Sequence, residues 1–140
     1  MLARLLVGFG VMAICVAVHA IGVTIALRHL RKAAPRVHTF LRMTEVLVLV
    51  AVWVVLFHLI EIGAWAALYV ISGAITDLPS AAYFSAVTYT TTGYGDIVLP
   101  ASWRIDAGME ALTGIIMCGW STGFFFAVVS RAYDPHGLPY

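Results

Sequence analysis

Three long apolar runs dominate the chain, at residues 5–27, 46–71 and 107–130. The first contains no charged residue, whereas the second is interrupted by His58 and Glu61. Each run exceeds the roughly 20 residues that a helix needs to cross about 30 Å of hydrocarbon. A segment that spans a membrane must be a helix or part of a closed barrel, and runs this long and continuous predict three membrane helices.

A fourth apolar stretch, residues 81–89, is too short to span. Asp77 stands at the N-cap position before it and Pro79 in its first turn, which predicts a helix start. We expect a re-entrant helix over residues 78–90. The non-helical backbone that follows is tolerated at membrane depth only if it is buried in protein or lines a watery cavity.

The composition agrees with a bilayer environment. Of 140 residues, 62% are hydrophobic and 11% are charged, whereas soluble domains carry about 25% charged residues. We interpret Cys15 and Cys118 as buried small hydrophobes, because both lie in apolar runs without metal-ligand spacing. The net charge of +1 gives no sign of a nucleic acid partner.

The distribution of charges predicts the orientation. Residues 28–42 contain no acid and five bases: Arg28, Arg31, Lys32, Arg36 and Arg42. By the positive-inside rule this loop is cytoplasmic, so a multi-pass protein of the cell membrane is predicted, with its N-terminus outside and its C-terminus cytoplasmic. A cleaved signal peptide ending near Val18-His19-Ala20 is the alternative. The loop either serves as a topology signal alone or also contacts the heads of anionic membrane lipids. Four acids are then expected at or near an outer entrance, where they would concentrate cations: Asp77, Asp96, Asp106 and Glu110.

The re-entrant helix leads into residues 88–96, Thr-Tyr-Thr-Thr-Thr-Gly-Tyr-Gly-Asp. A ring of backbone carbonyls can replace the water shell of an ion, provided that alternate residues adopt unusual backbone angles. Gly93 and Gly95 tolerate positive φ at little cost. The partly negative C-terminus of the preceding helix favours a cation nearby.

Residues 91–96 resemble the selectivity filter of the potassium channel family, usually T-V-G-Y-G-D, and the resemblance extends from about residue 45 to 131. It implies an outer helix at 46–72, a pore helix at 78–90, the filter at 91–96 and an inner helix at 105–130. It also implies that K⁺ is coordinated by the carbonyls of Thr91, Thr92, Gly93 and Tyr94 and the Thr91 hydroxyl, that Gly95 completes the filter, and that the protein is a homotetramer without other cofactors. The extra helix and basic linker at 1–45 lie outside the pattern. The tail at 132–140 is too short for a soluble ligand domain.

Thr92 departs from the pattern, since the family usually has valine or isoleucine there. We therefore keep a less selective cation channel as an alternative, and a non-conducting membrane scaffold as another. An enzyme is not expected: Gly119 to Gly123 fit the G-x-S-x-G nucleophile pattern, but they lie inside a membrane helix with no strand before them.

Further candidates surround the filter. His58 and Glu61 share a helix face, and we expect either a brace to Thr88 or Tyr89, with pH sensitivity, or a hydrogen bond without a regulatory role. A carboxylate metal centre would need more acids than this interior offers. Gly114 or Gly119 is a hinge or a close-packing position, and Phe124 and Phe125 form a dewetting gate or face lipid. His19 is expected to face other helices or lipid, and no contact motif places the first helix.

Overall fold

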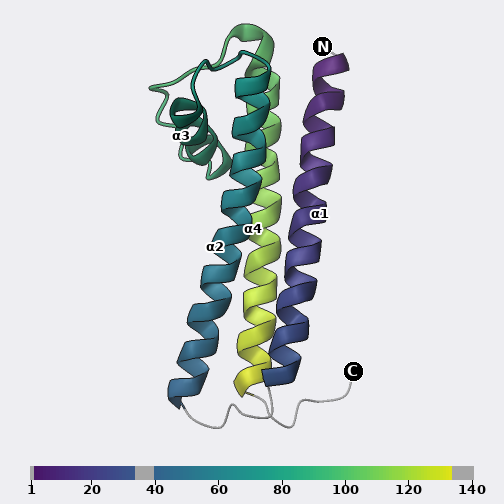
Figure 1. The fold of residues 1–140 in the computed structure, drawn as a ribbon, viewed down its shortest axis with the longest axis vertical. Coiled ribbons are helices and arrows are strands. Elements are labelled where there is room, and N and C mark those ends of the chain that lie inside the picture. The colour runs from purple at the N-terminus through teal and green to yellow at the C-terminus, as the bar shows by residue number, and fades with distance from the viewer. Residues whose placement is uncertain (1, 34–39, 134–140) are drawn as a thin grey trace.

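Three long helices and one short helix make up the part of the chain that the computed structural model describes, residues 2–33 and 40–133 (Figure 1). They are α1 (Leu2–Ala33), α2 (Phe40–Ile71), α3 (Leu78–Tyr89) and α4 (Arg104–Tyr133), with a short 3₁₀ turn, η2 (Ala101–Trp103), before α4. Three segments are long and apolar enough to cross a membrane: Leu2–His29, Leu41–Ile71 and Ala101–Ser130. The predicted all-helical membrane fold with three spans is therefore confirmed.

The spanning helices extend beyond the predicted apolar runs. α1 continues to Ala33 and α2 begins at Phe40, so both reach into the basic segment expected to be a loop. Lysine and arginine are good helix formers, and a helix does not have to end where the hydrocarbon ends. The short helix α3 keeps the predicted start and ends one residue before the predicted boundary.

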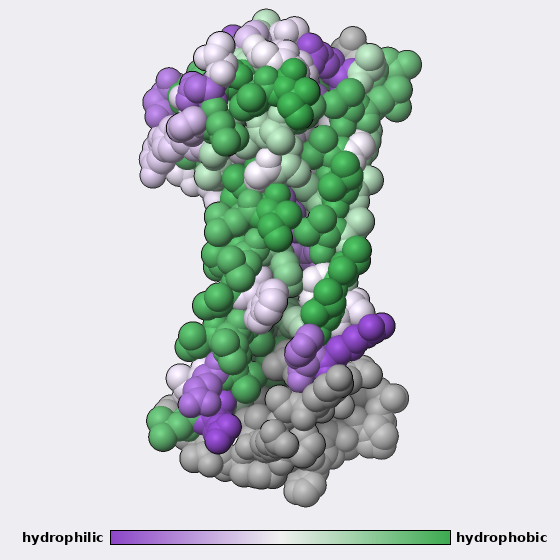
Figure 2. All heavy atoms as spheres, viewed as in Figure 1, coloured by the Kyte–Doolittle hydropathy of each residue, from purple (hydrophilic) through white to green (hydrophobic). Residues whose placement is uncertain are grey.

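The three long helices run side by side, and α3 lies beside α2 and α4 at the end that holds the N-terminus (Figure 1). Hydrophobic side chains cover the middle of the face shown in Figure 2, and hydrophilic ones gather toward its two ends. This is the pattern expected of a protein whose middle is surrounded by lipid.

Local signals fix both ends of the connection between α2 and α3. Gly73, at φ 71°, ends α2, and the N–H of Ala74 donates to the carbonyl of Tyr69 at 2.9 Å. This is the usual way for a glycine to close a helix. Asp77 caps α3 as predicted, accepting a 2.9 Å hydrogen bond from the N–H of Ser80.

α1 packs against α4 and α2 within the chain. A side chain at Gly8 would come within 2.6 Å of the Met109 sulfur, and one at Gly22 within 2.5 Å of the Phe57 ring. Cys15 is fully buried in the same interface. The second cysteine corrects our expectation, because Cys118 is exposed on the single subunit.

The closest backbone approach joins α3 to α4. A Cβ placed on Gly114 would lie 1.8 Å from the carbonyl oxygen of Tyr89, the last residue of α3. No real contact is this short, so a side chain at position 114 would force the two helices apart. The glycine thus sets how near the end of α3 comes to α4.

We predict that Gly114→Ala destabilises the purified protein in detergent by about 1–3 kcal/mol, the usual cost of overpacking. Gly119→Ala is the matched control on the same helix. Apart from the backbone of its own helix turn, no described atom would lie within 4 Å of a Cβ there, so alanine should be neutral or stabilising, by at most about 1 kcal/mol. Thermal unfolding of both variants checks this, and equal losses would contradict it.

Candidate functional site

The run after α3 has an unusual backbone. Thr91, Gly93 and Gly95 have φ values of 59°, 55° and 77°, so every second residue is left-handed. Positive φ is expected at the two glycines, but Thr91 is the one non-glycine residue with positive φ in the described ranges. Such a conformation costs an L-residue about 1–2 kcal/mol and tends to persist where function requires it.

Hydrogen bonds tie this run to the end of α3. The N–H groups of Thr92 and Gly93 donate to the carbonyl of Val87 at 2.9 and 3.2 Å, and that of Thr91 donates to Thr88 at 2.9 Å. Within residues 2–33 and 40–133, no hydrogen bond reaches the carbonyls of residues 91–94. These oxygens are therefore available to a ligand.

The hydroxyl of Thr92, the departure from the family pattern, has a partner in the same subunit. It lies 3.0 Å from the hydroxyl of Thr90, which in turn donates to the carbonyl of Ala86 at 2.7 Å. The extra polar group is thus linked back to α3.

Asp96 closes the run and is held by α3. The hydroxyl of Tyr83 donates to its carboxylate at 2.7 Å, and this hydrogen bond lowers the pKa of Asp96 and raises that of Tyr83. Because the pKa of Asp96 is depressed, the bond stabilises the fold at pH values above 3.8, the ordinary pKa of the group. This stabilisation is lost as the pH falls through the depressed pKa. It is intact at neutral pH. Both groups are exposed to solvent, so the contribution is small.

A cleft of about 190 Å³ separates α3 from the run, and Thr88, Gly93, Gly95 and Asp96 are among the residues that line it. The ring of Tyr94 is 71% exposed, so it does not pack against the run within the single chain. Residues 90–96 are all exposed in the single chain.

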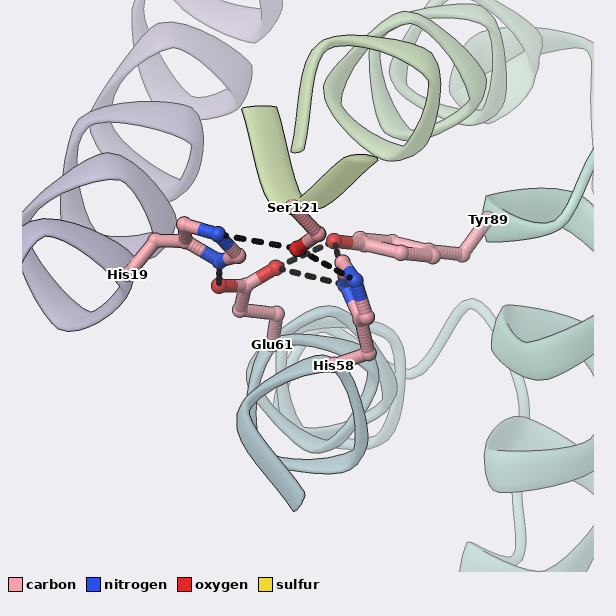
Figure 3. Close-up of polar contacts among 5 residues, drawn as sticks. All are labelled: His19, His58, Glu61, Tyr89 and Ser121. Atoms are coloured by element: carbon pink, nitrogen blue, oxygen red, sulfur yellow. Dashed lines mark hydrogen bonds and ion pairs between the residues drawn. The ribbon is translucent and has the colours of Figure 1, made fainter. Parts of the chain in front are cut away.

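A largely buried polar cluster lies at the end of α3, where side chains from all four helices meet (Figure 3). We call it the His–Glu cluster, and its members are His19 of α1, His58 and Glu61 of α2, Tyr89 of α3 and Ser121 of α4. Glu61 accepts from the Tyr89 hydroxyl and lies 2.8 Å from Nδ1 of His19. Nδ1 of His58 lies 3.0 Å from the Tyr89 oxygen, and Ser121 Oγ lies 3.1 Å from Nε2 of both histidines.

The hydrogen bonds of the His–Glu cluster fix its proton content. Five bonds need five protons. Tyr89, Ser121 and two neutral imidazoles supply four, while an ionised Glu61 supplies none. One further proton, on an imidazole or on the carboxyl group, satisfies every bond and makes the cluster neutral overall. A neutral cluster is the inexpensive state in a membrane interior.

Sequence spacing anticipated only part of the His–Glu cluster. It places His58 and Glu61 together and gives Tyr89 as a partner, whereas Thr88 is not a member. His19 and Ser121 were missed as members, although a lone histidine in a charge-free span was a signal. The two are 102 positions apart, and no local pattern pairs residues at that separation.

Comparison with known proteins gives a family for this architecture. Residues 44–131 match the ion channel family, whose members are pore domains of the two-transmembrane potassium channel type. The chain belongs to the ion channel family. Neither the comparison with curated proteins nor that with solved structures gave a match. The match begins after α1, and an ion channel family is not an enzyme family.

Two acids of this channel subunit lie elsewhere than expected. Asp106 and Glu110 are fully buried rather than at an entrance, and Glu110 accepts a 2.8 Å hydrogen bond from Tyr69. Our expectation came from topology, which places a residue at a depth but not on a face. Asp77 and Asp96 are exposed, as an entrance would require.

The gating candidates divide by burial. Gly114 packs on Tyr89, whereas Gly119 has no neighbour within 4 Å in the described subunit. Phe124 is buried between helices with Val23, Ala26 and Val50, and Phe125 packs against the same group. This packing gives Gly114 and Phe124 structural roles within the subunit; their role in gating stays a prediction, as does that of Gly119 and Phe125.

We predict that His19 and Glu61 are energetically coupled. A double-mutant cycle of His19→Ala and Glu61→Ala should give a coupling free energy of about 1 kcal/mol or more, because removing either residue leaves one buried polar atom of the other, Oε1 of Glu61 or Nδ1 of His19, without this partner. The matched control is a second cycle that combines His29→Ala with Glu61→Ala. The ring of His29 bonds the carbonyl of Ile25 on its own helix. Reversible unfolding in mixed micelles measures both cycles, and equal coupling in the two would contradict the prediction.

Proposed function

We propose that the chain is a subunit of a homotetrameric, potassium-selective channel that conducts K⁺ passively. The observation that carries the proposal is the run at 91–95, with left-handed backbone at every second residue and carbonyls that no described group engages. Membership of the ion channel family supports it.

The chemistry follows from the needs of a dehydrated ion. The carbonyls of Thr91, Thr92, Gly93 and Tyr94, with the Thr91 hydroxyl, would replace the water shell of K⁺. One subunit supplies only one wall of such a site, so several must surround an axis. Residues 90–96 are exposed in the single chain, which leaves them free to face that axis and the neighbouring subunits.

Orientation in the membrane follows from the two ends of the subunit. The N-terminus lies at the same end as α3 (Figure 1). Arg28, near the C-terminal end of α1, and Arg42, near the N-terminal end of α2, are exposed. These helix ends lie at the other end of the subunit, away from α3 (Figure 1). By the positive-inside rule, that end is cytoplasmic and the filter opens outward in the cell membrane.

Ion flux into liposomes containing the purified protein tests the proposal. We expect K⁺ flux to exceed Na⁺ flux many-fold and to be blocked by Ba²⁺. Gly93→Ala should abolish it, because alanine is strained at φ 55°. Gly63→Ala is the matched control, since that glycine lies within α2 and has no neighbour within 4 Å in the described subunit.

The other outcomes identify the alternatives. Equal K⁺ and Na⁺ fluxes would indicate the less selective cation channel, and Thr92→Val, which removes the bond to Thr90, should then restore discrimination. Absence of flux for either ion, from protein shown to be tetrameric, would contradict conduction and favour a scaffold subunit.

A further inference from the structure

The His–Glu cluster gathers more metal-binding atoms than a hydrogen-bonded brace requires. One ligand atom from each of His19, His58 and Glu61 lies within 4.8 Å of the other two. Both Nδ1 nitrogens face the carboxylate of Glu61, at 2.8 Å for His19 and 3.5 Å for His58. The phenolic oxygen of Tyr89 lies 3.0 Å from Nδ1 of His58 and bonds the same carboxylate.

These separations suit one tetrahedral ion. Zinc binds histidine nitrogen and carboxylate oxygen at about 2.0–2.2 Å, which places neighbouring ligand atoms about 3.3 Å apart. The separations of 2.8, 3.0 and 3.5 Å lie near that value, with Oε1 of Glu61 toward His19 and Oε2 toward His58. The oxygens of Tyr89 and Glu61 are in hydrogen-bond contact and would move apart around an ion. We propose that His19, His58, Glu61 and Tyr89 form a binding site for a divalent metal ion of the zinc type.

The surroundings of the two histidines support the same assignment. A histidine that binds a metal through one ring nitrogen usually donates its other N–H to a fixed acceptor. Ser121 Oγ lies 3.1 Å from Nε2 of both His19 and His58. A single hydroxyl oxygen thus orients both rings with their Nδ1 nitrogens toward Glu61.

Charge balance also permits a dication here. The hydrogen-bonded cluster is neutral with one extra proton. An ion of charge +2 that replaced this proton and the phenolic proton of Tyr89 would leave the cluster neutral, because ligands bind metals in their deprotonated forms. Because net charge is costly in a membrane interior, a cluster that is neutral both with and without the ion can bind it without that cost.

The ion would bridge the first helix to the pore. Its ligands come from α1, α2 and the last residue of α3, which lies two residues before the proposed filter run. Of the four proposed ligands, His58 is the one whose side chain reaches the subunit surface, at 16% exposed, whereas the other three are buried. A bound ion would fix α1 against the pore helix.

The test uses full-length protein in which His29, His38 and His136 are glutamine, so that the histidines of the cluster are the only ones left. Cobalt(II) is the probe, since its visible absorption distinguishes four-coordinate from six-coordinate sites. We expect one Co²⁺ per chain with the strong absorption of four-coordinate cobalt, displaced by Zn²⁺ but not by Mg²⁺. This measurement involves no ion flux, so it stands or fails independently of the proposed potassium conduction.

Substitutions locate the ligands. His19→Gln and His58→Gln should each weaken Co²⁺ binding by at least about 100-fold, and Ser121→Ala, which loses the supporting oxygen, by about 10-fold to 100-fold. Thr122→Val is the matched control, because the Thr122 hydroxyl bonds its own helix at Cys118. Absence of Co²⁺ binding by the cluster-intact protein, or a six-coordinate spectrum that His19→Gln leaves unchanged, would overturn the proposal even if some variants failed to fold.

Discussion

The position of Tyr89 is the constraint on which the rest of the structure depends. At membrane depth, a backbone that leaves its helix must find partners in protein, because lipid offers none. Tyr89 ends α3 at that point, its hydroxyl bonded to Glu61 and its carbonyl oxygen held against Gly114. The N–H groups of the run that follows donate to Val87 and Thr88, and no hydrogen bond within residues 2–33 and 40–133 reaches the carbonyls of residues 91–94.

This support reaches beyond the part of the chain that matches the ion channel family. α1 lies outside the match, yet His19 lies 2.8 Å from Glu61, which accepts a hydrogen bond from Tyr89 at the end of α3. One chain therefore contains its own support for residues 91–95. Residues 90–96 are exposed on that single chain, where the proposed neighbouring subunits would cover them.

Local features of the fold could be predicted from the sequence, and distant pairings could not. The spans follow from single continuous apolar runs, and the cap at Asp77 and the positive φ of Gly93 and Gly95 follow from patterns a few residues long. The contact of His19 with Ser121 joins positions 102 apart, and no periodicity encodes it. Burial of Glu110 was missed for the same reason, because its partner Tyr69 is on another helix. The left-handed backbone conformation of Thr91 follows from the geometry of the run rather than from any backbone preference of threonine.

A structure of the purified protein in lipid nanodiscs, with Rb⁺ or Tl⁺ in place of K⁺, tests the central assignment most directly. We expect four copies around one axis, with ion density in line between the carbonyls of Thr91, Thr92, Gly93 and Tyr94. An assembly in which residues 91–96 lie away from the axis, or an axis without ions between those carbonyls, would contradict the assignment of this run as the potassium filter.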